Sequence, residues 1–334
     1  MKRRIILSVL AVAALLILIF FWTMPGPPPP VILPNPNGYD DLVKATQRFV
    51  GDLPECYWDQ WDDDCAEEVR ALLKANAEAL RMVRLGLSRE SRIPIVYSRA
   101  YFTQHLSELA SLKRLAQLMI AEGKLAEKDG GIDDAVQSYL GVALIHEKLR
   151  GGVVIDELVG IAVEHMGVGA LRNLADQMTV IQRREVIEKL SNLHTNRDSY
   201  EQFLANEKRS IRVYGIREQF EYHGKFWQKR KTERYFLRKL NYSRARLGLF
   251  LVDLGLRNFE AENKRPPKTI QELVPKYLPF LPKDNFSGND FVYRPSTNGY
   301  EVYGLGPDGI DDGGKPLVRK GTDSPGDMLP NAQF

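Results

Sequence analysis

The N-terminal stretch constrains this chain most, because it predicts a helix that spans a membrane. Basic residues 2–4 precede residues 5–22, an apolar run in which Ser8 is the only polar residue. A helix of that length rises roughly 27 Å, which is close to the thickness of the hydrocarbon core of a bilayer. The sequence therefore predicts a transmembrane signal anchor over residues 1–24.

The charges beside this run predict its orientation. Basic residues on the short leading side of a span favour a cytoplasmic N-terminus, so we expect a single-pass protein of the inner (cytoplasmic) membrane with its bulk in the periplasm. The alternative is a cleaved signal peptide, whose apolar region is usually shorter and ends at small residues. Here the run ends in Phe20, Phe21 and Trp22, which favours the anchor. The proline-rich residues 25–38 predict an extended linker.

Residues 39–240 show a helical pattern of apolar residues. Between positions 106 and 118 leucine recurs every three residues, which indicates a wide buried helix face. The glycine pairs at 130–131 and 151–152 interrupt the pattern, so we expect one helix between them and another after the second pair. We interpret this region as a mainly helical domain of antiparallel hairpins.

Composition and motifs exclude several classes of protein. The chain is 44% hydrophobic and 27% charged, which supports an ordinary packed core. A formal charge of +3, from 46 basic and 43 acidic residues, is too balanced to predict nucleic-acid binding. His146-Glu147 begins like the zinc-protease motif H-E-x-x-H, but Arg150 occupies the fifth position. We interpret the five histidines as surface or satisfied core residues, identify no catalytic residues and favour a non-enzymatic role.

Cys56 and Cys65 are the two cysteines of the chain, which excludes a four-cysteine metal site. In an oxidising compartment outside the cytoplasm a pair at this spacing favours a disulfide. The alternative is a pair of free thiols.

Residues 208–246 are strongly basic, with thirteen Lys or Arg residues against three glutamates, and eight aromatic residues are interleaved. Outside the cytoplasm, acidic lipid headgroups or an acidic protein partner are better candidates than nucleic acid. The simpler interpretation is a set of amphipathic helices with aromatics packed inward and basic residues in solvent. The candidate basic patch comprises Lys225, Lys229, Arg230, Lys231 and Arg234.

Residues 241–334 differ in character from the region before them. A leucine-rich helix is expected to end near Asn263, and a short second helix follows at residues 270–274. Two strand-like runs, 291–294 and 300–303, are joined by a segment that ends in Asn-Gly, which is typical of a β-hairpin turn. The predicted fold class is α+β, with a helical domain followed by a small helix-plus-antiparallel-sheet module and a Gly/Asp-rich tail.

Two stretches of this module resemble a known family. They are L-P-K-D-N-F-S-G at 281–288 and Y-E-V-Y-G-L-G-P-D-G-I-D-D-G-G at 300–314. Residues 243–314 resemble the globular C-terminal part of the major pseudopilin of type II secretion systems, which implies the fold of that part. A pseudopilin runs from a processed apolar helix directly into this module, whereas here a long helical region intervenes, so we expect a borrowed fold and no polymerising subunit. The whole layout also resembles that of exported hypothetical proteins of planctomycete-type bacteria, which implies no function.

The resemblance also implies a calcium loop after the last strand. Asp308 matches the first acidic ligand of the family, and the carbonyl of Leu305 matches a backbone ligand. Lys315 stands where the family has its downstream acidic pair. Calcium accepts six to eight oxygens in flexible geometry, so other acidic residues could substitute: Asp311, Asp312, Asp323 and Asp327. The alternative is a solvated acidic turn.

The sequence supports three classes of function. The leading hypothesis is a membrane-anchored, non-enzymatic interaction or scaffold protein outside the cytoplasm, with protein partners in the cell envelope and a link to a secretion or pilus-like assembly. The second is an envelope hydrolase with an unrecognised site. The third is a binder of acidic lipid or polymer through residues 208–246.

Overall fold

The computed structural model describes residues 14–15, 32–57, 61–95, 99–210, 226–296, 299–317 and 325–330. Residues 33–334 form one compact unit, and residues 1–32 form another. The predicted anchor lies almost entirely outside the described residues, as does the first half of the proline-rich linker, residues 25–31. Within the described part of the chain, no helix is both long and apolar enough to cross a membrane.

The described part of the second unit is mostly helical, with one small sheet, so the predicted α+β class is confirmed at this level. Its helices are α2 (Gly38–Arg48), η1 (Glu55–Tyr57), α3 (Asp63–Ala75), α4 (Ala77–Leu87), α5 (Arg99–Lys128), α6 (Ile132–Lys148), α7 (Val154–Leu174), α8 (Val180–Thr195), α9 (Tyr200–Ser210), α11 (Phe226–Asn263) and η3 (Ile270–Leu273). Its strands are β1 (Val292–Ser296) and β2 (Gly299–Tyr303).

Local signals in the sequence set the ends of these helices. Helix α5 ends before Gly130, whose φ of 79° is the left-handed conformation that glycine adopts most easily. Helix α8 begins with a capping box, in which Thr179 and Gln182 each bond the backbone N–H of the other. The helices expected between and after the two glycine pairs are therefore confirmed as α6 and α7.

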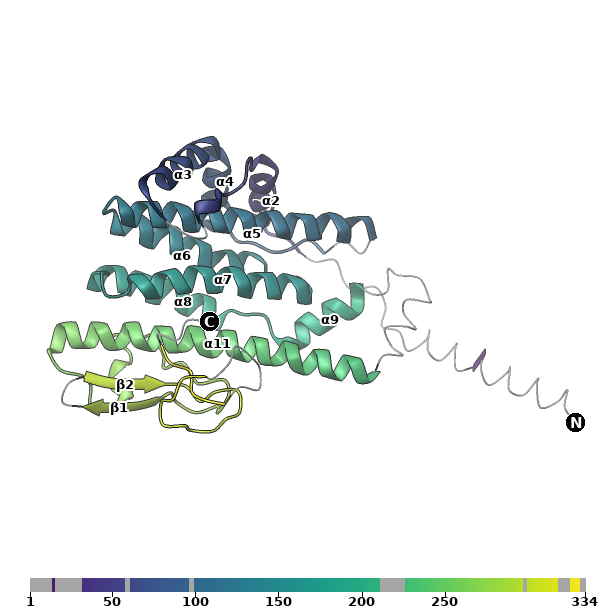
Figure 1. Ribbon diagram of the computed structural model, residues 1–334. Helices are drawn as coiled ribbons and strands as arrows, with labels where there is room; N and C mark the ends of the chain where they lie inside the picture. Colours follow the sequence, from purple (N-terminus) through teal and green to yellow (C-terminus); the bar gives the residue numbers. More distant parts are fainter. Residues whose placement is uncertain are drawn as a thin grey trace, which may run out of the picture. The chain divides into compact units, whose positions relative to one another are not determined.

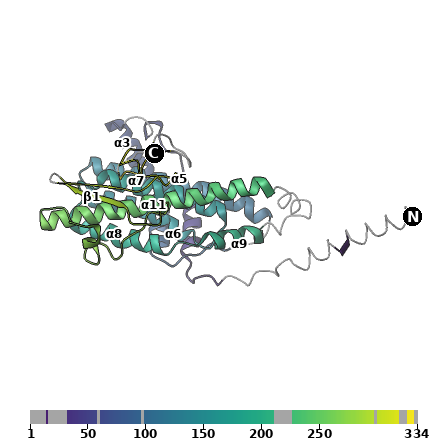
Figure 2. The same cartoon turned by 90° about the horizontal axis from the view of Figure 1, so that it is seen from below.

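The long helices lie in successive layers (Figure 1). Helix α5 contacts α6 and α7, α6 contacts α7 and α8, and α11 contacts both α7 and α8. The shorter α2, α3 and α4 cover α5, and the β-hairpin lies on the other side of α11 from α7. Figure 2 shows the same layers from below, with α11 running across them.

The C-terminal part has the hairpin that the sequence predicts. Strands β1 and β2 are antiparallel, with Val292 opposite Tyr303 and Ser296 opposite Gly299. Asp284 is buried and links the turn before β1 to the chain after β2. Its Oδ2 accepts hydrogen bonds from Ser287 Oγ at 2.9 Å and Leu305 N at 3.0 Å.

Helix α11 belongs both to the helical layers and to the C-terminal part. It is continuous through residues 240 and 241, the predicted boundary between the helical domain and the C-terminal module. One hydrophobic core runs from Tyr39 in α2 through Leu251 in α11 to Met328 in the tail. The two regions therefore share a helix and a core.

The cysteines near the start of α3 are paired. Cys56 and Cys65 lie at disulfide distance, with their Cα atoms 5.8 Å apart, and no cysteine of the chain is free. The predicted pairing is therefore seen in the structure, where it joins η1 to the first turn of α3.

Two glycines of α7 offer a test of the α6–α7 packing. A Cβ at Gly167 would lie 2.5 Å from Tyr139 O and Ala143 N of α6, whereas one at Gly169 would meet nothing within 4 Å. We expect Gly167→Ala to lower the free energy of unfolding by about 1–3 kcal/mol through overpacking. We expect Gly169→Ala to raise it by up to about 1 kcal/mol through helix propensity. Urea unfolding of the two variants measures these changes. Equal effects of the two substitutions would contradict the close packing of α7 against α6 at Gly167.

Candidate functional site

A buried ionic centre lies where α6, α7 and α11 meet. Glu164 of α7 is 1% exposed, and its Oε2 accepts a hydrogen bond from His146 Nδ1 of α6 at 2.6 Å. Arg197, in the loop after α8, donates from Nη2 to both Glu164 oxygens at 2.7 and 2.6 Å. Ser243 of α11 donates to Glu164 Oε1 at 3.2 Å. One carboxylate therefore joins three helices and a loop.

The second nitrogen of His146 also contacts a carboxylate, because Nε2 lies 2.8 Å from Glu157 Oε2. Glu157, Gly160 and Glu164 lie at helical spacing on one face of α7. A Cβ at Gly160 would overlap the His146 ring, so the glycine makes room for the imidazole. A carboxylate only accepts hydrogen bonds, so both ring nitrogens donate and His146 is protonated.

Charges in this centre balance, with His146 and Arg197 against Glu157 and Glu164. Burial alone would lower the pKa of His146, but Glu157 and Glu164 outweigh it and raise that pKa to about 9. Burial would raise the pKa of Glu164, but Arg197 and His146 hold it well below its usual range. A buried pair or network of this kind is stable only while every partner is present.

A second buried histidine lies at the start of α7. His105 Nε2 of α5 lies 2.6 Å from Asp156 Oδ1, and His105 Nδ1 lies 3.0 Å from Tyr39 OH of α2. Tyr101 stacks on the imidazole with ring centroids 5.4 Å apart. Burial would lower the pKa of His105, but the hydrogen bond and charge of Asp156 lead the groups that raise it. This cluster joins α2, α5 and α7.

These two clusters join the helices, and none of their residues lines either of the two cavities described below. The structure thus shows His105 and His146 as satisfied core residues, in line with the interpretation of the sequence. That interpretation is wrong for His165 and His194, each of which has a buried ring nitrogen without a hydrogen-bond partner among the described residues. The hydrogen-bond partners of His105 and His146 lie on other helices, and the incomplete zinc-protease motif at His146 did not predict them.

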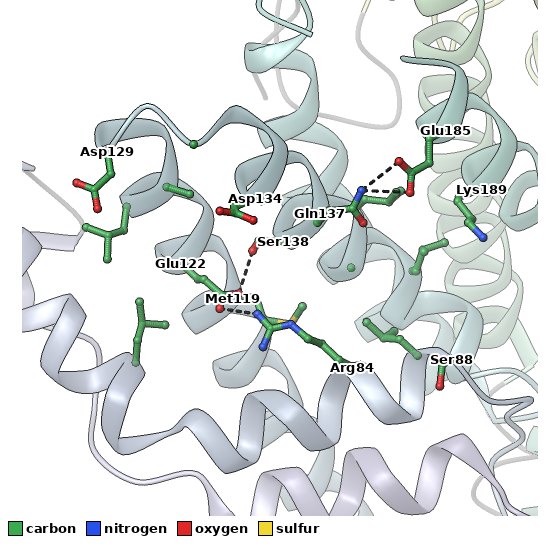
Figure 3. A pocket seen from close by; sticks show the side chains of 18 residues that line it. Arg84, Ser88, Met119, Glu122, Asp129, Asp134, Gln137, Ser138, Glu185 and Lys189 are labelled. Carbon is green, nitrogen blue, oxygen red and sulfur yellow. Dashed lines mark hydrogen bonds and ion pairs between the residues drawn. The ribbon is translucent and has the colours of Figure 1, made fainter. Parts of the chain in front are cut away.

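An open groove lies between α4, α5, α6 and α8 (Figure 3). Its volume is about 750 Å³. Apolar side chains line much of it: Leu73, Leu87, Met119, Leu125, Ala126, Leu140 and Leu144. The groove is the best candidate for a binding site in the described part of the chain, since it joins apolar surface to several polar groups.

Acidic groups predominate among the polar residues of the groove. Its four carboxylates are Glu122, Asp129, Asp134 and Glu185, and its two cations are Arg84 and Lys189. Arg84 Nη2 contacts Glu122 Oε1 at 2.5 Å, and Ser138 Oγ donates to Glu122 Oε2 at 2.9 Å. Figure 3 shows Gln137 donating to Glu185, at 3.1 Å from each carboxylate oxygen.

A smaller cavity of about 460 Å³ lies between α11, β2 and the C-terminal tail. Asp253 and Arg257 of α11 line it, and they form an ion pair at 2.8 Å. Tyr300 and Tyr303 of β2 line it from the other side. The polar groups of α11 in this cavity are therefore already paired with each other.

The candidate calcium residues occupy the loop after β2. Asp308 and Asp311 accept backbone N–H groups of their own turns at 3.2 and 2.9 Å. Asp312 Oδ2 accepts from Gly326 N at 2.9 Å, and Asp327 Oδ2 accepts from Gly314 N at 2.8 Å. Leu305 begins the loop, with its N–H bonded to Asp284, and Asp323 lies outside the described residues.

Asp327 is the unusual member of this loop. It is fully buried, its Oδ1 has no hydrogen-bond partner among the described residues, and burial raises its pKa. Within the described ranges, no group of three or more His, Cys, Asp or Glu side chains is arranged to hold a metal ion. A calcium site in this loop stays a prediction.

The candidate basic patch lies mostly outside what the structure describes. Lys225 is not described, and the side chains of Lys229, Arg230 and Lys231 in α11 are not described either. Arg234 is exposed on α11. The patch as a binding surface stays a prediction.

No family model, curated protein or solved structure matches this chain. The resemblance to the major pseudopilin therefore stays a prediction drawn from residues 243–314.

The buried centre predicts how stability depends on pH. The pKa of His146 lies above its unfolded value near 6.5, so its stabilising contribution is complete below pH 6.5 and is lost as pH rises towards 9. Burial, followed by nearby arginines, lowers the pKa values of His165 and His194 to about 4, so stability also falls as pH drops from 6.5 to 4. Denaturant unfolding of the full chain should show maximum stability near pH 6.5.

His146→Gln is the matched variant for this profile. We expect it to cost about 3–5 kcal/mol at pH 6.5, because it leaves two buried carboxylates short of a charge partner. It should weaken the decline between pH 6.5 and 9, leaving the part that the raised pKa of His105 contributes, and should keep the decline between 6.5 and 4. An unchanged alkaline decline in the variant would show that His146 is not the group responsible.

Proposed function

We propose that this protein is a membrane-anchored scaffold outside the cytoplasm, whose groove between α4, α5, α6 and α8 binds a basic amphipathic helix of a partner protein. The observation that carries the proposal is the groove itself, with apolar side chains and twice as many carboxylates as cations. Grooves of this kind take the apolar face of a helix, whose anchors recur at helical spacing.

Charge in the groove favours a basic partner. Asp134 forms no hydrogen bond or ion pair with a described residue, and Glu185 contacts Gln137 and no described cation. Both carboxylates line the groove, and neither forms an ion pair with a described residue. Lys or Arg residues beside the apolar face of a partner helix would complement them, and such complementarity gives specificity and a fast association rate.

The anchor and the linker support the location of this scaffold. Residues 1–24 would fix the chain in the membrane, and residues 25–38 would hold the folded unit away from the surface. The pseudopilin-like stretches support a link to a secretion or pilus-like assembly. Binding is favoured over hydrolysis because Glu164, whose carboxyl pKa is strongly lowered, is enclosed in the ionic centre and faces neither cavity.

Site-specific photocrosslinking in cells tests the proposal. A photoreactive residue at Ser88, which lines the groove and is exposed, should crosslink to a partner, and mass spectrometry should place the crosslink in a basic amphipathic segment. The same residue at Glu68, which is exposed on α3 and does not line the groove, should not. Crosslinks to an acidic segment, or equal capture at Glu68, would contradict the proposal.

Charge reversal provides the matched control. We expect the double variant Asp134→Lys/Glu185→Lys to lose the crosslink at Ser88 by at least tenfold, since like charges would then face each other. The double variant Glu68→Lys/Glu188→Lys changes net charge equally on exposed positions outside the groove and should keep it. Equal loss in both variants would mean that overall charge, and not the groove, determines binding.

A further inference from the structure

Arg172 of α7 is a buried arginine without a hydrogen-bond or ion-pair partner among the described residues. It is 9% exposed, and it forms no hydrogen bond or ion pair with a described residue. Its Nε and Nη2 atoms are fully buried. Buried charges in folded proteins are normally paired, so an unpaired guanidinium in this position requires an explanation.

The neighbours of Arg172 do not neutralise it. Its guanidinium lies over the ring of Phe250 in α11, with the Cζ atom 5.4 Å from the ring centroid. Asp253 is the carboxylate whose charge reaches it, but Asp253 pairs with Arg257. Burial and then the positive charge of Arg246 lower the pKa of Arg172 to about 9. Two cations therefore stand close together at the interface of α7 and α11.

A second unsatisfied group lies on the same face of α7. His165, Gly169 and Arg172 are at i, i+4 and i+7, so they share one side of the helix. The Nε2 atom of His165 is buried and has no hydrogen-bond partner among the described residues. Between the two side chains, Gly169 has no side chain, and the space where its Cβ would stand is open.

Helix α11 forms the other side of this notch. Tyr242 packs edge-on against His165, with ring centroids 6.3 Å apart. Arg246 is close enough to act on the pKa values of both His165 and Arg172. His165, Tyr242 and Arg246 are each partly exposed, so the notch opens to solvent.

We propose that this notch, formed by His165, Gly169 and Arg172 of α7 and by Tyr242 and Arg246 of α11, binds a phosphate group. Guanidinium groups hold phosphate oxygens in a bidentate geometry that suits their planar fork of N–H donors. An anion here would supply the hydrogen-bond acceptors that Arg172 lacks and would relieve its repulsion with Arg246. The imidazole of His165 would donate a further hydrogen bond from Nε2.

The test measures thermal unfolding of the full chain, solubilised in detergent. It compares phosphate buffer with chloride buffer at equal ionic strength. We expect phosphate to raise the Tm in a saturable way, because a ligand that binds only the folded state stabilises it. We expect His165 to show a higher pKa by NMR in phosphate, since a bound anion favours the imidazolium. If phosphate changes neither the Tm nor the pKa of His165, the proposal is overturned, because ordered water would then satisfy Arg172.

Three variants separate the site from general salt effects. Arg172→Met should abolish the phosphate effect without lowering the Tm in chloride, since it removes an unpaired buried charge. Gly169→Leu should abolish the effect by filling the notch while both guanidinium groups remain. Arg81→Met, at an exposed arginine that pairs with Glu78, should keep the full effect. An Arg172→Met variant that still gains stability from phosphate would overturn the proposal.

The phosphate group can come from a soluble molecule or from a lipid headgroup, and two further probes distinguish these sources. Glycerol phosphate should reproduce the phosphate effect on the Tm if the ligand is soluble. Vesicles that contain phosphatidylglycerol, compared with vesicles of phosphatidylcholine alone, should shift the His165 resonance if the ligand is a headgroup. A response to neither probe, in wild type or in Arg81→Met, would limit the site to inorganic phosphate.

Discussion

The carboxylate of Glu164 is the group on which the arrangement of the long helices depends. It is fully buried in α7, and its hydrogen bonds reach His146 of α6, Arg197 of the loop after α8 and Ser243 of α11. Hydrophobic contact is non-directional, so the core alone leaves the helices free to slide or rotate. A charged acceptor with three fixed donors leaves far fewer arrangements in which no buried charge is stranded. The C-terminal hairpin packs on α11, so its position also depends on this centre.

Helix α11 connects the ionic centre to both candidate binding surfaces. On one side it contacts α7 and α8, and α8 contributes Glu185 and Lys189 to the acidic groove. At its contact with α7 it forms the cationic notch beside Arg172. The proposed scaffold therefore presents two surfaces of opposite charge on one rigid frame, one suited to a basic helix and the other to a phosphate group. A partner held at one surface would be positioned with respect to the other.

Local features of the fold could be predicted from the sequence, and long-range ones could not. Turn chemistry and apolar periodicity act over a few residues, so they predict local features. These features are the helix ends at the glycine pairs 130–131 and 151–152, the end of α11 at Asn263 and the β-hairpin. The partners of Glu164 were not, since Arg197 and Ser243 reach its carboxylate only after the helices have packed. The groove and the notch were missed for the same reason, although an arginine at 172 within an apolar helical stretch was a usable signal.

Native-state hydrogen exchange of Glu164→Gln measures the role of the ionic centre most directly. Loss of one partner from a buried charge network costs about 3–5 kcal/mol. The account therefore predicts that the buried amides of α6, α7 and α11 lose protection together, by roughly two to four orders of magnitude. Glu185→Gln, in the open groove, should leave all three helices unchanged. Loss of protection confined to α7, with α6 and α11 as in the wild type, would contradict the claim that Glu164 holds these layers together.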